Sequence, residues 1–162
     1  PIKMFKIIFT IFLISISAIA QKQMPNIELS SIQGKSFNVS KDFNDHDKLY
    51  VFSFWATWCA PCVNELEAFH QNYENWKKEL DIEIIAVSVD DSRTQKRVKP
   101  FLNGKNWNFN VLLDSNQELK RALSIVNVPY TIIVKNKKIV YLSNGYTQGA
   151  ENELYKKLIE LK

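Results

Sequence analysis

The sequence predicts an α/β domain in which one helix connects two parallel strands of a central sheet. The segment LYVFSFW, at 49–55, is almost wholly apolar and rich in aromatic and β-branched residues, which is typical of a strand buried on both faces. The segment IEIIAVSVD, at 82–90, has the same character. Between them, apolar residues recur every three or four positions, which predicts a helix and therefore a parallel βαβ unit. The predicted helical face comprises Cys62, Leu66, Phe69, Tyr73, Trp76 and Leu80.

The rest of the chain continues this alternation of helices and strands. A short or broken helix is expected within 91–106, because Pro100 interrupts that segment. A hairpin is expected further on, although its turn, Asn136-Lys137, lacks the glycine common in such turns. The elements expected after 106 are a strand at 108–114, a helix at 116–125, hairpin strands at 130–136 and 137–143, and a final helix at 151–162. The residues expected to face inward are Leu119, Ala122 and Leu123 in the first of these helices and Leu154, Leu158 and Leu161 in the last.

The beginning of the chain has the layout of a secretory signal peptide. Lys3 and Lys6 precede an uncharged apolar run at 7–20, which ends in the small-residue pattern AIA. A retained membrane anchor is the alternative, although the run is shorter than the about 20 apolar residues that span a bilayer. We therefore assign 1–20 to the signal peptide, 21–26 to a linker and 27–162 to a single domain.

Composition and charge favour a globular domain and argue against nucleic-acid binding. Of the 162 residues, 46% are hydrophobic and 23% are charged, enough apolar side chain for a core. Without Lys3 and Lys6, 19 of the 21 basic residues remain against 17 acidic ones, so the net charge is about +2. No basic stripe with interleaved aromatic residues is present in the sequence, so no nucleic-acid partner is expected.

The only two cysteines of the chain, Cys59 and Cys62, lie where the first buried strand gives way to the helix. A disulfide between them would close a very short loop and stabilise the fold little, so a structural staple is disfavoured. At a helix N-terminus the dipole favours a thiolate, which makes Cys59 the expected nucleophile. Cys62 lies one turn further, on the buried face, where it suits the resolution of a mixed disulfide. Pro61 fits the first helical turn, where a missing N–H costs little.

A metal site is disfavoured, because zinc needs four ligands and the chain offers one cysteine pair with His46 and His70 standing alone. His70 falls beside the apolar stripe of the helix and is expected at its boundary. No metal is therefore expected at the cysteine pair.

Two stretches together resemble the signatures of the thioredoxin superfamily. FWATWCAPC, at 54–62, resembles the redox motif behind a buried strand, and NVPYTIIV, at 127–134, resembles the proline loop that faces the cysteines. The N-terminal segment and the added segment before 108 resemble the TlpA/ResA-type branch, whose members are periplasmic or extracytoplasmic. The resemblance covers 25–162 and implies a thioredoxin-like three-layer sandwich, with a central mixed β-sheet flanked by helices.

The resemblance implies a role for each matching position. Cys59 and Cys62 match the redox pair, and Trp58 matches the tryptophan that borders it. Pro129 matches the proline that family members hold in cis, and the resemblance implies that a substrate backbone pairs with Val128 beside it. From the residues alone a trans proline would be expected, because only about 5–6% of X–Pro bonds are cis.

The chain departs from the family pattern at two positions, Ser53 and Glu67, and matches the TlpA/ResA-type pattern at Glu65. Thioredoxins proper carry a buried acid six residues before the first cysteine, where this chain has Ser53. TlpA/ResA-type proteins often carry a glutamate three residues after the second cysteine, and Glu65 stands there as a candidate general base for Cys62. An exposed helical glutamate is the alternative. Relatives usually have a kink proline where Glu67 stands, so we expect a straighter helix.

The resemblance implies an exported, monomeric thiol-disulfide oxidoreductase that reduces disulfides in exported proteins, for example during cytochrome c maturation. Its implied partners are protein disulfide substrates and a membrane thiol electron donor, and it needs neither metal nor organic cofactor. The alternatives are a disulfide-donating oxidant or isomerase, a thiol peroxidase, and a non-catalytic binding module. A peroxidase is disfavoured, because it needs a proline and a threonine where this chain has Phe52 and Ala56.

Overall fold

A seven-stranded mixed sheet forms the centre of the protein, whose computed structural model describes residues 22–162. The strand order is β2-β1-β5-β4-β3-β6-β7. The pairs β3–β4 and β4–β5 are parallel, and the other neighbouring strands are antiparallel. The strands are β1 Glu28–Ser31, β2 Ser36–Asn38, β3 Leu49–Trp55, β4 Ile82–Ser88, β5 Asn110–Leu113, β6 Tyr130–Lys135 and β7 Lys138–Asn144.

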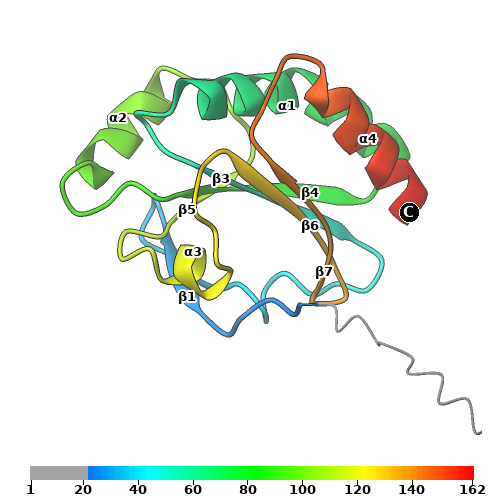
Figure 1. Ribbon diagram of the computed structural model, residues 1–162, viewed down its shortest axis with the longest axis horizontal. Coiled ribbons are helices and arrows are strands. Elements are labelled where there is room, and N and C mark those ends of the chain that lie inside the picture. Colours follow the sequence, from blue (N-terminus) through cyan, green and yellow to red (C-terminus); the bar gives the residue numbers. More distant parts are fainter. Residues whose placement is uncertain (1–21) are drawn as a thin grey trace, which may run out of the picture.

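Helices cover both faces of this sheet and complete three layers. Figure 1 shows α1 and α4 on one side of the sheet and α3 on the other. The helices are α1 Ala60–Glu79, the 3₁₀ helix η1 Gln95–Arg97, α2 Val98–Asn103, α3 Glu118–Ala122 and α4 Ala150–Leu161. The three-layer sandwich with a mixed central sheet, expected from the sequence, is confirmed.

The core forms where the predicted βαβ unit was expected. All seven residues of β3 are buried, because the strand lies between β4 and β6 with helices over its faces. The α1 face from Cys62 to Leu80 is also buried. Strands β3 and β4 run in parallel register, with Trp55 opposite Ser88, so their carboxyl ends meet at one edge of the sheet. The turn from β3 into α1 opens at that edge.

The segment 22–26 differs from the linker expected there. The Lys22 carbonyl accepts a hydrogen bond from the Ile139 N–H at 2.9 Å, and the Met24 N–H donates to the Lys137 carbonyl at 2.8 Å. Met24 is only 5% exposed. The segment therefore packs against the β6–β7 hairpin, because burial of this apolar side chain and two backbone hydrogen bonds hold it there. The expected signal peptide at 1–20 lies outside the described residues.

Pro100 does not interrupt the helical segment after β4. It is the third residue of α2, within the first helical turn, where a backbone N–H has no partner in the helix to lose. The 3₁₀ helix η1 leads directly into α2. One short helix is thus confirmed, whereas its interruption at Pro100 was wrong.

The helix expected at 116–125 is reduced to the five residues of α3. Leu119 and Leu123 are buried as expected, but Ala122 is exposed, which corrects its predicted inward position. The chain leaves the helix at once, since Ser124 adopts a φ of 61° in the left-handed region. Ala122 is the last residue of this short helix and is exposed there.

The β6–β7 hairpin is confirmed, and its turn does without glycine. Asn136 and Lys137 both lie in the left-handed region, with φ values of 51° and 64°. This is the pattern of a type I′ turn, whose twist matches that of the flanking strands. Asparagine tolerates this conformation better than most residues, which explains the first position.

Within residues 22–162, no helix is both long and apolar enough to cross a membrane.

Candidate active site

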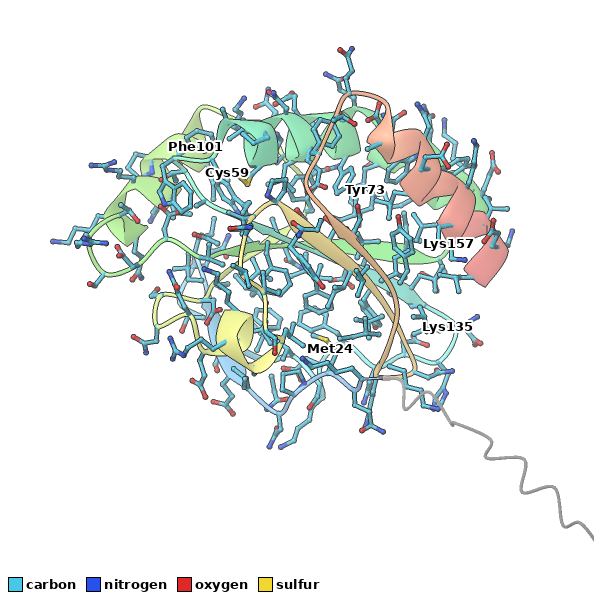
Figure 2. All side chains as sticks on the ribbon, in the orientation of Figure 1. Met24, Cys59, Tyr73, Phe101, Lys135 and Lys157 are labelled. Carbon is cyan, nitrogen blue, oxygen red and sulfur yellow. A yellow bond between two sulfur atoms is a disulfide. The ribbon has the colours of Figure 1, made fainter. Side chains whose placement is uncertain are left out.

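The cysteine pair lies at the N-terminus of α1, immediately after the buried strand β3. Cys59 is the N-cap residue, and its Sγ accepts a hydrogen bond from the Cys62 N–H at 3.3 Å. The Cys59 N–H in turn donates to the Ala56 carbonyl at 3.1 Å, which closes the turn after β3. Cys59 and Cys62 form a disulfide with Cα atoms 5.3 Å apart. Figure 2 labels Cys59 beneath the N-terminal end of α1.

The two sulfurs differ in their access to solvent. Cys59 is 5% exposed, whereas Cys62 is fully buried on the helix face that packs against the sheet. Trp58, directly before the pair, is 61% exposed, and Pro61 is exposed in the first helical turn. Of the two sulfur-bearing residues, Cys59 is therefore the more accessible, and it follows the exposed Trp58 directly in the chain.

Limited alkylation of the reduced protein is expected to label Cys59 well before Cys62. Cys59 is the more accessible thiol and has the helix N-terminus to favour its thiolate. The test uses substoichiometric iodoacetamide at neutral pH, followed by peptide mass spectrometry. Preferential labelling of Cys62 would reverse the two roles, and the denatured protein, which should label both equally, is the control.

The proline loop faces the same edge of the sheet as the cysteine pair. The peptide bond between Val128 and Pro129 is cis, as the resemblance implied. Tyr130, the next residue, pairs with Phe54, which places Pro129 level with the last residue of β3. Pro129 is buried and Val128 is half-buried. The Pro129 carbonyl accepts a hydrogen bond from the Gly145 N–H at 2.8 Å, so the loop is also held from β7.

Glu65 is buried beneath the pair and is not the exposed helical glutamate considered as an alternative. It is 4% exposed, one turn after Cys62 on the same helix. Its Oε2 accepts hydrogen bonds from Ser53 Oγ at 2.8 Å and from Thr131 Oγ1 at 3.1 Å. Ser53 and Thr131 are register partners on β3 and β6, so their hydroxyls converge on one carboxylate. Ser53, which stands where thioredoxins carry their buried acid, thus donates a hydrogen bond to a different buried acid, Glu65 on α1.

Burial raises the pKa of Glu65 to about 7, although the two hydroxyl bonds oppose this shift. The carboxyl also borders a small cavity lined by Tyr146 and Glu151. There the Tyr146 hydroxyl donates to Glu151 at 2.8 Å, and burial together with this bond raises the pKa of Tyr146 to about 12. Glu65, with its pKa raised to about 7, therefore lies close to a tyrosine whose raised pKa keeps it protonated at neutral pH.

Glu67 connects α1 to the segment that precedes β5. Its Oε2 accepts hydrogen bonds from Lys105 Nζ at 3.1 Å and from Trp107 Nε1 at 3.2 Å. Trp107 packs in turn against Trp55 at the end of β3, with ring centroids 5.6 Å apart. Helix α1 continues through Glu67 without interruption. The residue in place of the family's kink proline thus holds the added segment against the active helix.

Asp90 belongs to the same edge and was not singled out from the sequence. Its Oδ2 accepts hydrogen bonds from the Thr57 N–H at 2.9 Å and from Ser88 Oγ at 2.9 Å, and its Oδ1 accepts from Thr57 Oγ1 at 2.7 Å. The available signal was an acid directly after a buried strand, at the carboxyl edge where the β3–α1 turn also begins. Asp90 therefore joins the end of β4 to the turn before Cys59.

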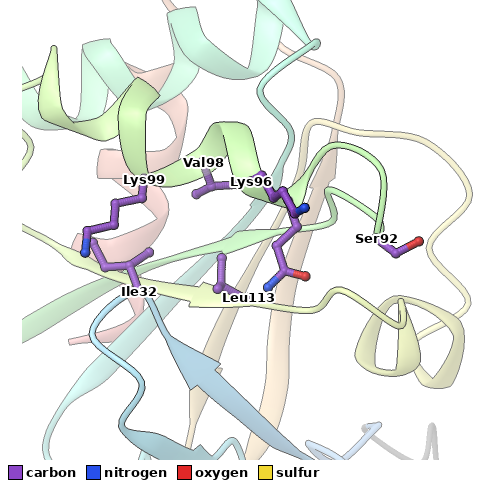
Figure 3. A pocket seen from close by; sticks show the side chains of 7 residues that line it. Ile32, Ser92, Lys96, Val98, Lys99 and Leu113 are labelled. Carbon is purple, nitrogen blue, oxygen red and sulfur yellow. The ribbon is translucent and has the colours of Figure 1, made fainter.

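Among residues 22–162, no three or more histidine, cysteine, aspartate or glutamate side chains gather as they would around a metal ion. His70 is half-buried on α1, the boundary position expected for it. A groove of about 460 Å³ lies between the η1–α2 segment and the neighbouring strands β1 and β5 (Figure 3). Its apolar lining comprises Ile32 and Leu113 on the strand side and Val98 on the helical side, where Lys96 and Lys99 also line it. Neither cysteine lines it.

Residues 20–143 match the AhpC/TSA family. The chain is 30% identical over 139 residues to "Thiol-disulfide oxidoreductase ResA" of Bacillus thuringiensis subsp. konkukian, and the match covers 85% of this chain and 77% of that protein. A ResA of Bacillus subtilis is also 30% identical, over 122 residues, which are 75% of this chain and 65% of that protein.

Solved structures give the same result for the fold. The solution structure of an uncharacterized thioredoxin-like protein from Porphyromonas gingivalis superposes with a TM-score of 0.74, at 42% identity, over 85% of this chain and 90% of that one. A putative thiol:disulfide interchange protein DsbE from Chlorobium tepidum superposes with a TM-score of 0.75, over 86% and 95% of the two chains. At 19% identity, the second match supports the thioredoxin-like fold alone.

Proposed function

This chain belongs to the AhpC/TSA family and is a thiol-disulfide oxidoreductase with a thioredoxin-like fold, and from that premise we propose that it reduces disulfides in exported proteins. The observation that carries the proposal is the unequal access of the two sulfurs. Cys59 caps the helix and can be reached, while Cys62 is fully buried one turn behind it. Two-step disulfide exchange needs this difference in access, because the mixed disulfide must form at the first thiol before the second thiol can attack it.

In this proposal Cys59 is the nucleophile and Cys62 the resolving thiol. The Cys59 thiolate attacks one sulfur of the substrate disulfide, that bond breaks, and the departing thiolate takes up a proton. Cys62 then attacks Cys59, the mixed disulfide breaks, and the substrate leaves as a dithiol. Two electrons have passed to the substrate, and the protein retains the Cys59–Cys62 disulfide. The chemistry requires neither a metal nor an organic cofactor.

Glu65 is the proposed general base for Cys62. With its pKa raised to about 7 by burial, both protonation states are populated at neutral pH. The ionised form takes the Cys62 proton before the resolving attack, and it returns a proton when the disulfide is reduced again. Ser53 and Thr131 orient the carboxyl for this exchange by donating to its Oε2.

Substrates are proposed to dock between Trp58 and the proline loop. Trp58 is exposed beside Cys59 and offers an aromatic surface, and Pro61 keeps the first helical turn in place. The backbone at Val128, next to the cis Pro129, would pair with an extended substrate chain. An extended chain there would place its disulfide against the reachable sulfur.

We further propose that 1–20 exports the chain, as a cleaved signal peptide or as a retained anchor that attaches the domain to the membrane. The working compartment would be the periplasm or another extracytoplasmic space, with the monomeric domain at 27–162 active there. Reduction outside the cytoplasm consumes electrons, so a membrane thiol protein must reduce the Cys59–Cys62 disulfide after each turnover. Cytochrome c maturation, which needs reduced cysteines in an exported protein, is the process that this chemistry fits.

The reduction potential of the Cys59–Cys62 pair tests the proposed direction. Equilibration with glutathione or dithiothreitol at pH 7 should give a value close to the about −270 mV of thioredoxin. A value close to the about −120 mV of DsbA would identify a disulfide donor instead. Insulin reduction under dithiothreitol provides the companion assay, because a binding module without exchange chemistry would leave insulin soluble.

A further inference from the structure

Two hydrogen bonds from Thr57 to Asp90 fix the turn that carries Cys59. The backbone N–H and the side-chain hydroxyl of Thr57 bind different oxygens of one carboxylate, so this segment cannot rotate without breaking a bond. Asp90 is itself anchored, because it accepts from Ser88 Oγ at 2.9 Å and its own N–H donates back to that hydroxyl at 3.2 Å. The turn two residues before Cys59 is thereby attached to the end of a central strand.

Asp90 also brings a charge into this buried edge. It is 1% exposed, and its two oxygens accept three hydrogen bonds, the pattern of an ionised carboxylate. Charges interact more strongly away from water, so the carboxylate disfavours a thiolate at Cys59 while leaving the neutral disulfide unaffected. The other buried acids within residues 22–162 are Glu65, on α1, and Asp114, directly after β5. None of these three acids is in an ion pair in the described part of the chain.

We propose that Asp90 is a positioning residue of the redox turn whose charge shifts the dithiol–disulfide equilibrium of Cys59 and Cys62 toward the disulfide. A pair with this bias gives up its electrons more readily, so Asp90 makes the enzyme a stronger reductant. The inference rests on the proposed function for its biological sense, since a bias toward the disulfide serves a reductase. The inference itself concerns the difference in the dithiol–disulfide equilibrium between variants. It holds whether the wild-type protein reduces or oxidises its substrates.

Replacing Asp90 with asparagine tests the charge, because Asp90→Asn keeps the shape and an acceptor oxygen for Thr57. The measurement is the equilibrium of the purified domain with glutathione at pH 7, in which two glutathione thiols reduce the protein disulfide and form one glutathione disulfide. Loss of the carboxylate should raise the equilibrium constant for protein reduction about five- to tenfold. Tenfold corresponds to a potential about 30 mV less reducing. Should Asp90→Asn not fold, Asp90→Ser removes the charge while keeping a hydroxyl for Thr57.

Thr57→Val is the matched control, because it loses the 2.7 Å hydroxyl bond and keeps the charge. Its equilibrium constant should stay within about twofold of the wild type, while amide exchange in the turn becomes faster. An unchanged constant in Asp90→Asn, or an equal shift in Thr57→Val, would overturn the role of the charge. An oxidising wild type would refute the proposed direction of catalysis, yet a shift confined to Asp90→Asn would still support this inference.

Discussion

Cys62→Ser is expected to leave the protein covalently attached to its physiological substrate. Cys59 can still attack a substrate disulfide, because it is reachable and its N-cap position is unchanged. Release then requires an attack on Cys59 from the position of Cys62, where the serine hydroxyl hardly ionises at neutral pH. Turnover should fall by on the order of 10³-fold or more, as when a covalent nucleophile is removed from other enzymes.

The trap is read on a non-reducing gel of the cell fraction that holds the exported protein. Cys62→Ser should give adducts that dithiothreitol dissolves, and mass spectrometry of those bands identifies the substrate proteins. Cys59→Ser is the matched control, because the same substitution one helical turn earlier removes the thiol that attacks the substrate. It should therefore give far fewer adducts. Equally clean monomers from both variants, with export intact, would contradict exchange with protein disulfides.

The structure suggests that trapping will be efficient because a serine fits into the space that Cys62 occupies. Cys62 is fully buried among the core side chains of α1 and β3, and serine is smaller than cysteine. The helix N-cap depends on Cys59 Sγ and the backbone N–H of residue 62, and both remain in the variant. The fold around the mixed disulfide should therefore persist long enough for isolation.

Local patterns in the sequence were sufficient for the centre of the fold. The apolar run of β3 and the repeat of apolar residues on α1 each lie within one element, so propensity and periodicity describe them fully. The short strands β1 and β2 went unpredicted, because strands of three or four residues carry little periodicity. The packing of Met24 also escaped prediction, since it depends on a hairpin more than a hundred residues further along the chain.

The candidate site divides in the same way. The cysteine motif is contiguous and could be identified directly, and the cis Pro129 followed from a second contiguous motif. The setting of Glu65 could not be predicted, because Ser53 and Thr131 are 12 and 66 residues away in the chain. Asp90 reaches Thr57 across 33 residues in the same manner. Partners brought together only by strand pairing leave no local trace in a sequence.

Glu65→Gln is expected to stabilise the protein at alkaline pH and to leave it unchanged at acid pH. Burial raises the pKa of Glu65 from 4.5 to about 7 in the folded protein, whereas the unfolded chain keeps the ordinary value. Between these values the folded state holds a proton that the unfolded state has released, so stability falls as pH rises. The loss is complete above pH 7 and is on the order of 3 kcal/mol. Because glutamine does not ionise, the Glu65→Gln variant should not show this loss of stability.

Urea unfolding of the oxidised protein between pH 4 and pH 8 measures this difference. Ser53→Ala provides a control of opposite sign, because it removes a hydrogen bond that lowers the pKa of Glu65 and should extend the decline in stability to higher pH.

The wild type and Glu65→Gln together also test whether Glu65 acts as a general base. Disulfide exchange by the wild type should accelerate through pH 7 as Glu65 ionises, and Glu65→Gln should lose that inflection. Parallel stability curves for wild type and Glu65→Gln would mean that the buried carboxyl does not titrate in this window, and the proposed proton transfer to Glu65 would then be excluded.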